Sequence, residues 1–426
     1  MEDFDPIAYI NEPRWQKVSL GLSRTRLLLE KLGRPQDRLR FVHVAGTNGK
    51  GSTCAFLESV LRQAGYRTGL FTSPYIECFE ERIRVRGQNI SLDALRAVTL
   101  RVRDAAAQVA EELGEHPTEF ELMTAVALCH FANEQCDIVV LEVGLGGRLD
   151  STNVIERPDV CVITPIALDH TAILGNTLAA VAGEKAGICK PGVPVVSWPQ
   201  EPTAMAVVRA RTEELGCPLT VMDLAQLEVE PLTADFMRPF RYRGHSYRTQ
   251  LLGAYQPANA AMALEAIETL RAKGWDIPES AVEAGIAQAQ WPGRFELAAR
   301  DPLTIIDGGH NPQGAQALAD SLAGLVAEGS GVHFVMGVLA DKDYPAMIRA
   351  VAPFAASFMV YAPDNPRALP AEDLANAIAA ECVAPVTLAE SAEKALRQAR
   401  ARASEDTIIV AFGSLYAIAD LKKALP

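Results

Sequence analysis

The sequence predicts an α/β fold of two domains with mostly parallel sheets. Apolar strand-like runs alternate with helical stretches nearly throughout the 426 residues. These runs are apolar on both faces, which is typical of parallel strands that lie between layers of helices. A hydrophobic content of 49% with 22% charged residues is sufficient for large buried cores.

The predicted elements follow one another in a regular order. Strands are expected at residues 41–44, 68–71, 138–141, 160–163, 194–197, 303–306, 332–336, 358–361 and 407–411. Residues 238–248 differ, and they predict an exposed hairpin or edge region that turns at Gly244. Helices are expected at residues 54–61, 260–273 and 373–382.

A domain boundary is predicted near residues 291–296. A helix precedes this segment, and a new strand–turn–helix series starts after it at Leu303. We therefore expect a larger N-terminal domain over residues 1–296 and a smaller, Rossmann-like C-terminal domain over residues 297–426. Clefts between domains are preferred ligand sites, so the functional site is expected between these two.

Composition excludes several classes of partner. The formal net charge is −13, from 40 basic and 53 acidic side chains, which argues against a general nucleic-acid or anionic-membrane surface. None of the eight cysteines forms a CxxC pair, so free thiols in a reducing cytosol are expected. The acidic N-terminus lacks a signal-type apolar region, and no apolar run has the length of a membrane span. A cytoplasmic protein is therefore expected.

The most informative segment is the glycine-rich stretch from Gly46 to Thr53, between the first strand and a helix. Such a turn exposes backbone N–H groups at a helix N-terminus, which is a cradle for phosphates. Lys50 would reach the terminal phosphates as a point charge. Gly51 stands where the common P-loop has a Ser or Thr for magnesium, so Ser52, Thr53 or a hydroxyl from elsewhere would have to replace it. The alternative is an ordinary glycine turn.

Polar side chains follow three further N-terminal strands. Glu142 ends an apolar strand before a glycine-rich turn, and Ser73 and His170 each follow other strands. Sites in open α/β sheets lie at these carboxyl ends. Glu142 could therefore be a magnesium ligand facing the phosphate loop, Ser73 could supply the hydroxyl that Gly51 lacks, and His170 could hold a second metal or be structural. Lys185, considered alone, reads as a helix-surface lysine.

Two C-terminal strands end in similar turns. Asp307 and His310 share one turn before a helix, and Ser414 follows the last strand. These turns could recognise a ribose, an adenine or an amino acid, or they could be ordinary connections. Four arginines could receive substrate carboxylates or belong to a solvated basic face; they are Arg82, Arg84, Arg86 and Arg148.

Taken together, the motifs GTNGKGS, LEVGLGGRLDSTN, IALDH, GEKAGI, GRF and HNP resemble those of the dihydrofolate synthase/folylpolyglutamate synthase family, relatives of the Mur peptidoglycan ligases. The resemblance covers nearly the whole chain. It implies ATP-dependent amide formation on dihydropteroate and reduced folates. The substrate carboxylate takes the γ-phosphoryl group of ATP, and the amine of L-glutamate then displaces phosphate.

The resemblance also implies a role for each site residue. ATP is expected to contact Thr47, Asn48, Gly49, Lys50, Gly51, Ser52, Asn259, Arg294 and Asp307. Two Mg²⁺ ions are expected on Ser73, Glu142, His170 and Lys185, with Lys185 carbamylated by CO2. Lys50, His170 and Lys185 are the expected catalytic residues. No organic prosthetic group is expected.

Further residues match the stretches that hold the substrates in the family. The pterin substrate is expected beside Pro117, Thr118, Glu119 and Phe120, and beside Leu149, Asp150 and Ser151. Incoming glutamate is expected near His310 and Ser414. Glu119 stands where some bifunctional members carry Tyr, Tyr75 stands in place of a His, and Gly308-Gly309 in place of Val-Ala.

Other functions are open at this point. The chain could be a folylpolyglutamate synthase alone or a Mur-type amino-acid ligase, although only ~40 residues precede the phosphate loop, too few for a UDP-binding domain. A regulatory P-loop switch is a further alternative, but the Asn-Lys-x-Asp motif of GTPases is missing. We expect a monomer whose partners are small molecules.

Overall fold

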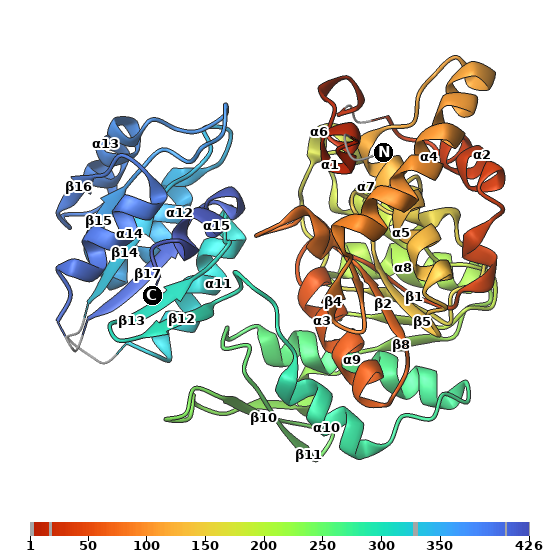
Figure 1. Cartoon of the computed structure of the whole chain (residues 1–426). Coiled ribbons are helices and arrows are strands. Elements are labelled where there is room, and N and C mark those ends of the chain that lie inside the picture. The colour runs from red at the N-terminus through yellow and green to blue at the C-terminus, as the bar shows by residue number, and fades with distance from the viewer. Residues whose placement is uncertain (1–3, 17–18, 327–330, 405–406, 426) are drawn as a thin grey trace.

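The structure of the protein is a computed structural model that describes residues 4–16, 19–326, 331–404 and 407–425. Two α/β units lie side by side, and each has its own sheet (Figure 1). The predicted fold class is thereby confirmed. Among the described residues, no helix is both long enough and apolar enough to cross a membrane.

The N-terminal unit is built on an eight-stranded sheet in the order β4-β3-β2-β5-β1-β6-β7-β8. Its strands are β1 (Phe41–Ala45), β2 (Thr68–Phe71), β3 (Ile83–Val85), β4 (Gln88–Asn89), β5 (Ile138–Glu142), β6 (Val160–Ile163), β7 (Val195–Ser197) and β8 (Leu219–Val221). All neighbouring pairs are parallel except β2–β3 and β3–β4. The carboxyl ends of β1, β2, β5 and β6 therefore share one edge.

Helices cover both faces of this sheet because its strands are apolar on both sides. Val42 and Val44 of β1 pack in one core with α3 (Lys50–Gln63), α9 (Gln256–Ala272) and α10 (Glu279–Gln288). Phe41 packs on the other face with α2 (Ser23–Lys31), α4 (Leu92–Leu113) and α5 (Glu119–Asn133). A further core joins β6 and β7 to α7 (Leu178–Ala186) and α8 (Pro202–Glu214).

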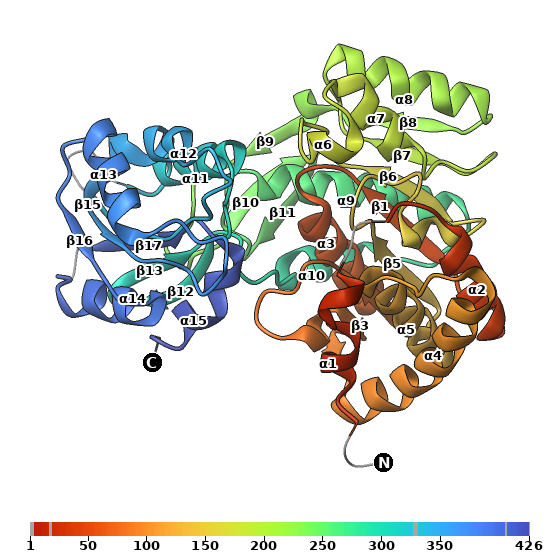
Figure 2. The ribbon, with the colours of Figure 1, turned by 90° about the horizontal axis from the view of Figure 1, so that it is seen from above.

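The hairpin predicted around Gly244 is present. Strands β10 (Arg238–Tyr242) and β11 (His245–Thr249) pair antiparallel, and β9 (Leu227–Val229) adds a third strand. Phe240 and Tyr242 are buried in the same core as α9. Seen from above, this small sheet and α10 lie on the side of the N-terminal unit that faces the C-terminal unit (Figure 2).

The C-terminal unit has a six-stranded sheet in the order β12-β13-β17-β14-β15-β16, parallel except for the pair β12–β13. Its strands are β12 (Glu296–Arg300), β13 (Leu303–Ile306), β14 (Val332–Met336), β15 (Ala355–Val360), β16 (Val386–Leu388) and β17 (Ile408–Phe412). One face packs on α11 (Pro312–Ala323), α12 (Tyr344–Val351) and α13 (Ala371–Glu381), and the other on α14 (Ala392–Ala401) and α15 (Ile418–Lys422).

The strands that the sequence did not predict are β3, β4, β8, β9, β12 and β16. Five of them lie at sheet edges, and β3 pairs with the edge strand β4. They are short and partly exposed, so they lack the continuous apolar run that identifies a buried strand. The helix predicted at 260–273 begins earlier, at Gln256, and ends at Ala272.

Candidate active site

Residues 46–49 form a tight turn between β1 and α3. Thr47 N and Asn48 N donate to Pro165 O at 2.8 and 3.3 Å, which fixes the turn against the segment after β6. Gly49 has φ +80°, and a Cβ there would lie 2.5 Å from Asn259 Oδ1. Glycine therefore permits both the left-handed backbone and the close approach of Asn259. The turn thus brings Asn259, expected at ATP, to the phosphate loop.

Gly51 lies in the first turn of α3, against Trp291. A Cβ at position 51 would lie 2.5 Å from Trp291 Cζ2, so the indole leaves no room for the Ser or Thr of the common P-loop. Ser52 and Thr53 are buried, and Thr53 Oγ1 has no hydrogen-bond partner among the described residues. The contact with Trp291 therefore explains why glycine stands at position 51, which the sequence alone did not explain.

Two lysines meet beside this turn. Lys50 Nζ donates to Gly46 O and Thr47 O at 3.1 and 3.2 Å, and Lys185 Nζ donates to Gly46 O at 2.7 Å. Both line a cavity of about 40 Å³. The residues that line it are Gly46, Thr47, Lys50, Val143, Gly144, Leu145, Gly146, Asp169, His170, Leu174 and Lys185. Three strand-end segments therefore meet at the phosphate loop, as predicted from their positions.

Lys185 is not the surface lysine that its local sequence suggested. It is 4% exposed, because the last turn of α7 packs against the glycine-rich turn after β5. A Cβ at Gly147 would lie 2.6 Å from Glu184 O. Burial, together with the positive charge of Lys50, lowers the pKa of Lys185 to about 7, although Asp169 and Asp150 act to raise it. A neutral amine is therefore accessible near neutral pH.

Glu142 and Ser73 lie together at the ends of β5 and β2. Ser73 N donates to Glu142 Oε2 at 3.2 Å, and Glu142 is only 4% exposed. Burial raises the pKa of Glu142 to about 7, although Lys50, the Ser73 amide and Arg294 act to lower it. A buried carboxylate beside a hydroxyl is a donor set that suits Mg²⁺, so these residues fit the predicted metal.

His170 follows β6 and begins the short helix α6 (Thr171–Leu174) with φ +47°. Its side chain is 56% exposed, and Nε2 lies 3.8 Å from Asp169 Oδ2. No cluster of three His, Cys, Asp or Glu side chains in the described part of the chain is arranged to hold a metal ion. The predicted metal set therefore depends on Ser73 and on a modified Lys185 in addition to Glu142 and His170.

The two predicted acceptor stretches adjoin each other. Thr118 caps α5 in a capping box with Glu121, and Phe120 packs against Gly144, where a Cβ would lie 2.4 Å from Phe120 Cζ. The hydroxyl groups of Thr124 and Ser151 are 2.9 Å apart. Pro117 is buried, and Leu149 is half-buried. Residues 117–120 and 149–151 therefore lie beside the glycine-rich turn that follows Glu142.

Asp150 organises that turn rather than pointing at solvent. It is buried and accepts hydrogen bonds from Leu145 N at 2.8 Å and Thr152 N at 3.0 Å. Burial raises its pKa, against the effect of these bonds. Arg148 pairs with Glu184 at 2.8 Å and is 56% exposed, so it lies at the rim of the site.

In the C-terminal unit, Asp307 joins three segments. Its carboxylate accepts from Phe295 N and Gly309 N, each at 2.7 Å, and from Tyr255 Oη at 3.4 Å. Arg294 acts on the pKa of Asp307 and also on that of Glu142 in the N-terminal unit. The charge of Arg294 therefore acts on a carboxylate of each unit.

His310 and Ser414 both belong to the C-terminal unit and follow β13 and β17. Burial lowers the pKa of His310, Arg294 and Lys342 lower it further, and Asp169 of the N-terminal unit raises it. His310 Nδ1 is 2.9 Å from Gly308 O. Ser414 is buried, and its Oγ has no partner among the described residues. The charge of Asp169, a residue that the sequence analysis did not single out, thus acts on His310 across the two units.

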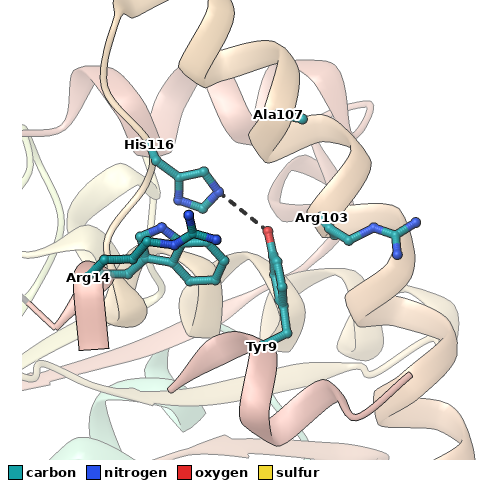
Figure 3. Close-up of a pocket in the computed structure, with 6 residues that line it drawn as sticks. Tyr9, Arg14, Arg103, Ala107 and His116 are labelled. Atoms are coloured by element: carbon teal, nitrogen blue, oxygen red, sulfur yellow. Dashed lines mark hydrogen bonds between the residues drawn. The ribbon is translucent and has the colours of Figure 1, made fainter. Parts of the chain in front are cut away.

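A larger cavity of about 490 Å³ is lined by Tyr9 of α1 (Pro6–Ile10), by Arg14 and Trp15, by Arg103 and Ala107 of α4, and by His116 (Figure 3). His116 stacks on Trp15 with ring centroids 4.2 Å apart, and its Nε2 lies 3.4 Å from Tyr9 Oη. His116 directly precedes Pro117, so this aromatic cluster supports the start of α5. The sequence analysis did not predict this cluster.

Comparison with known proteins agrees with this architecture. Residues 44–267 match the Mur ligase middle domain, and residues 293–415 match the glutamate ligase domain of Mur ligases. The fold and site therefore define a Mur-type ligase. The chain is 39% identical to the dihydrofolate synthase/folylpolyglutamate synthase of Bacillus subtilis, over 96% of this chain and 95% of that protein. It belongs to the dihydrofolate synthase/folylpolyglutamate synthase family.

Solved structures give the same result. The chain resembles Mycobacterium tuberculosis folylpolyglutamate synthase complexed with ADP and AMPPCP, with a TM-score of 0.87, 32% identity and 98% coverage of both chains. It also resembles Escherichia coli FolC in complex with DHPP and ADP, with a TM-score of 0.84 and 32% identity over 98% of this chain and 96% of that chain. The resemblance implied by the motifs is confirmed.

Proposed function

We propose that this chain joins L-glutamate to dihydropteroate and to the γ-carboxyl of tetrahydrofolates, using ATP and releasing ADP and phosphate. The observation that carries the proposal is the pair Lys50 and Lys185 at one cavity. Both lysines hydrogen-bond only to backbone carbonyls among the described residues. Lys50 is a cation without an acidic partner at the N-terminus of α3, which favours a phosphate ligand, and Lys185 adds a second nitrogen at the same place.

The chemistry explains why this charge is needed. A carboxylate and a glutamate are both anions, and the phosphoryl group between them is also negative. Lys50 and the N-terminus of α3 hold the ATP phosphates, together with Thr47, Asn48, Gly49, Gly51 and Ser52. Asn259, Arg294 and Asp307 place the rest of the nucleotide. Mg²⁺, held by Ser73, Glu142 and His170, supplies further charge neutralisation when bound.

Lys185 is proposed to carry a carbamate. Its neutral amine would form an N–C bond to CO2 and release one proton to water, which converts a cation into an oxygen ligand for Mg²⁺. The buried position beside Lys50 supports this, because an ammonium there would repel both Lys50 and a metal ion. His170, across the same cavity, would share the metal with it.

The acceptor is proposed to lie along residues 117–120 and 149–151, with Phe120 packing against the pterin or aminobenzoate. His310 and Ser414 would hold the incoming glutamate on the opposite side. We further propose that the chain divides at residues 296 and 297 and acts as a monomer in the cytoplasm. Names of relatives support the acceptor class, since the B. subtilis relative is called a dihydrofolate synthase as well as a folylpolyglutamate synthase.

The test measures ADP release with glutamate plus either dihydropteroate or tetrahydrofolate, with products identified by mass. Turnover of both acceptors supports the proposal. Turnover of tetrahydrofolate alone reduces the function to a folylpolyglutamate synthase. Turnover of a UDP-muramoyl acceptor, with neither folate acceptor used, would instead identify a Mur-type amino-acid ligase.

A further inference from the structure

Arg82 is a buried cation that the protein pairs incompletely. Its side chain is 10% exposed, and its Nε has no hydrogen-bond partner among the described residues. The guanidinium lies over the rings of Tyr75 and Phe79, at 5.0 and 5.5 Å from their centroids. These rings fix its position but do not satisfy its N–H groups. Buried guanidinium groups usually form charge-assisted hydrogen bonds on both sides of their fork.

The neighbouring acid in the sequence does not supply this pairing. Glu81 Oε1 accepts from the backbone N–H groups of Ile76 and Glu77, the latter at 3.1 Å, so its charge holds the loop after Ser73. Its other oxygen lies 3.8 Å from Arg84. Arg82 is left with one acid in salt-bridge range in the described structure, Glu119, at 3.5 Å.

Glu119 is well placed to leave Arg82. It is the first residue of α5, and its side chain is 24% exposed, so it can turn into solvent without disturbing the core. Thr118 and Glu121 form the capping box, so the helix does not need Glu119 for its cap. The pair is a long contact between a fixed cation and a movable acid.

The pair adjoins segments of the proposed site. Arg82 O accepts from Thr72 N at 3.1 Å, one residue before Ser73. Glu119 directly precedes Phe120, and the Tyr416 side chain of the C-terminal unit is close enough to act on the pKa of Arg82. A carboxylate bound to Arg82 would therefore lie among the metal loop, the acceptor stretch and the opposite unit.

We propose that Glu119 is a built-in counter-ion that the second carboxylate of a folate acceptor displaces from Arg82. The inference rests on the proposed function. Dihydropteroate has one carboxylate, which reacts, so Arg82 keeps Glu119. A tetrahydrofolate has a second, α-carboxylate, which binds the open fork of Arg82 and meets repulsion from Glu119. Glu119 is thus a positioning residue that sets the preference between the two acceptors.

The main test is Glu119→Gln, which keeps shape and removes charge. We expect KM for tetrahydrofolate to fall about three- to tenfold, with kcat nearly unchanged, because the repulsion acts on binding of the acceptor. KM for dihydropteroate should change clearly less than KM for tetrahydrofolate, since Glu119 also lies in the acceptor stretch but dihydropteroate leaves its pair with Arg82 intact. Calorimetric titration of tetrahydrofolate should show the same gain in affinity without turnover.

Two further variants isolate the mechanism. In an Arg82→Gln background, Glu119→Gln should have no additional effect on KM for tetrahydrofolate, because the two changes act through one contact. Asp93→Asn is the matched control. Asp93 is an acidic residue in the first turn of α4 that pairs with Arg96 at 3.1 Å and is 95% exposed. Asp93→Asn should therefore leave KM for both acceptors unchanged.

Each remaining result overturns the inference. An equal change in KM for both acceptors in Glu119→Gln would mean that Glu119 is structural. A change in KM for glutamate in both reactions would assign Arg82 to the incoming amino acid. If Arg82→Gln fails to fold, the comparison of KM for the two acceptors in Glu119→Gln still tests the inference. A wild-type protein that uses neither acceptor would refute the proposed function as well. Normal turnover of both acceptors, with the same KM change for both in Glu119→Gln, would refute this inference alone.

Discussion

The turn after β1 and the turn after β13 are similar connections, but their charged side chains, Lys50 and Asp307, have different partners. Both are glycine-rich connections from a buried strand to a helix, at facing edges of two sheets. Lys50, in the first turn, contacts only backbone carbonyls of its own loop among the described residues. Asp307, in the second, accepts three hydrogen bonds from three separate segments. Lys50 therefore has no acidic partner in the described structure, whereas Asp307, which is also proposed to contact the nucleotide, links three segments of the protein.

This difference separates function from stability. A cation without a protein partner contributes little to folding, so its removal should affect ligand chemistry. A buried carboxylate with several donors fixes the surrounding backbone, so its removal should affect the fold. The predictions below test that separation, from the largest expected effect to the smallest.

Lys50→Ala should reduce kcat/KM by about 10²-fold or more, comparable to the loss of one preorganised charge contact in a transition state. The free energy of unfolding should change little, because Lys50 has no acidic partner to lose. The measurement is ADP release together with urea unfolding. Lys394→Ala, which removes an exposed lysine of α14 paired with Glu390, is the control. Near-normal turnover in Lys50→Ala would remove the loop from catalysis.

Lys185→Ala should also be nearly inactive, with a loss of about 10²-fold or more if the missing group is a metal ligand. Acetate or propionate should restore part of the activity by replacing the carbamate oxygens. Enzyme equilibrated with carbon-13-labelled CO2 should show a carbamate resonance that Lys185→Ala lacks. A bare amine in active, magnesium-loaded wild-type enzyme would contradict the proposal.

Asp307→Asn should lower the free energy of unfolding by about 2 kcal/mol, because an asparagine can accept on one side only and would leave one buried N–H unpaired. Activity should fall as well, since Phe295 and Gly309 lose their common anchor beside Arg294. The measurement is urea unfolding followed by circular dichroism. Asp343→Asn, an exposed cap of α12, should cost less. Unchanged stability in Asp307→Asn would reject its role as a junction.

The sequence could predict those parts of the site that follow strand periodicity. The turn after β1, Glu142 at the end of β5 and His170 after β6 were placed together because parallel strands share an edge. It could not predict Trp291 over Gly51 or the burial of Lys185, since each depends on a helix packing against a loop distant in sequence. Edge strands were missed for a related reason, because partial exposure removes their apolar signal.

The smallest expected effect concerns Lys422, a lysine of α15 whose charge the protein uses internally. Its Nζ lies 2.5 Å from Glu77 and 2.7 Å from Glu296. Glu77 belongs to the loop after Ser73, so the contact links the C-terminal unit to the N-terminal unit. Burial lowers the pKa of Lys422, but the bonds to Glu296 and Glu77 outweigh burial, and the pKa is raised above its ordinary value.

Lys422→Met should therefore destabilise the protein by about 0.5–1 kcal/mol, the range for ion pairs that keep some exposure to solvent. Because the folded-state pKa is raised, this stabilisation is complete below the unfolded pKa and is lost as pH rises through the folded pKa. The difference in free energy of unfolding between wild type and variant should thus be constant from neutral pH to about pH 9 and become smaller at higher pH. Salt at about 1 M should also reduce it. Urea unfolding at several pH values measures this. A loss of turnover like that of Lys50→Ala, with stability unchanged, would show that Lys422 serves the ligand instead, and the proposed separation of the two kinds of charge would fail at this residue.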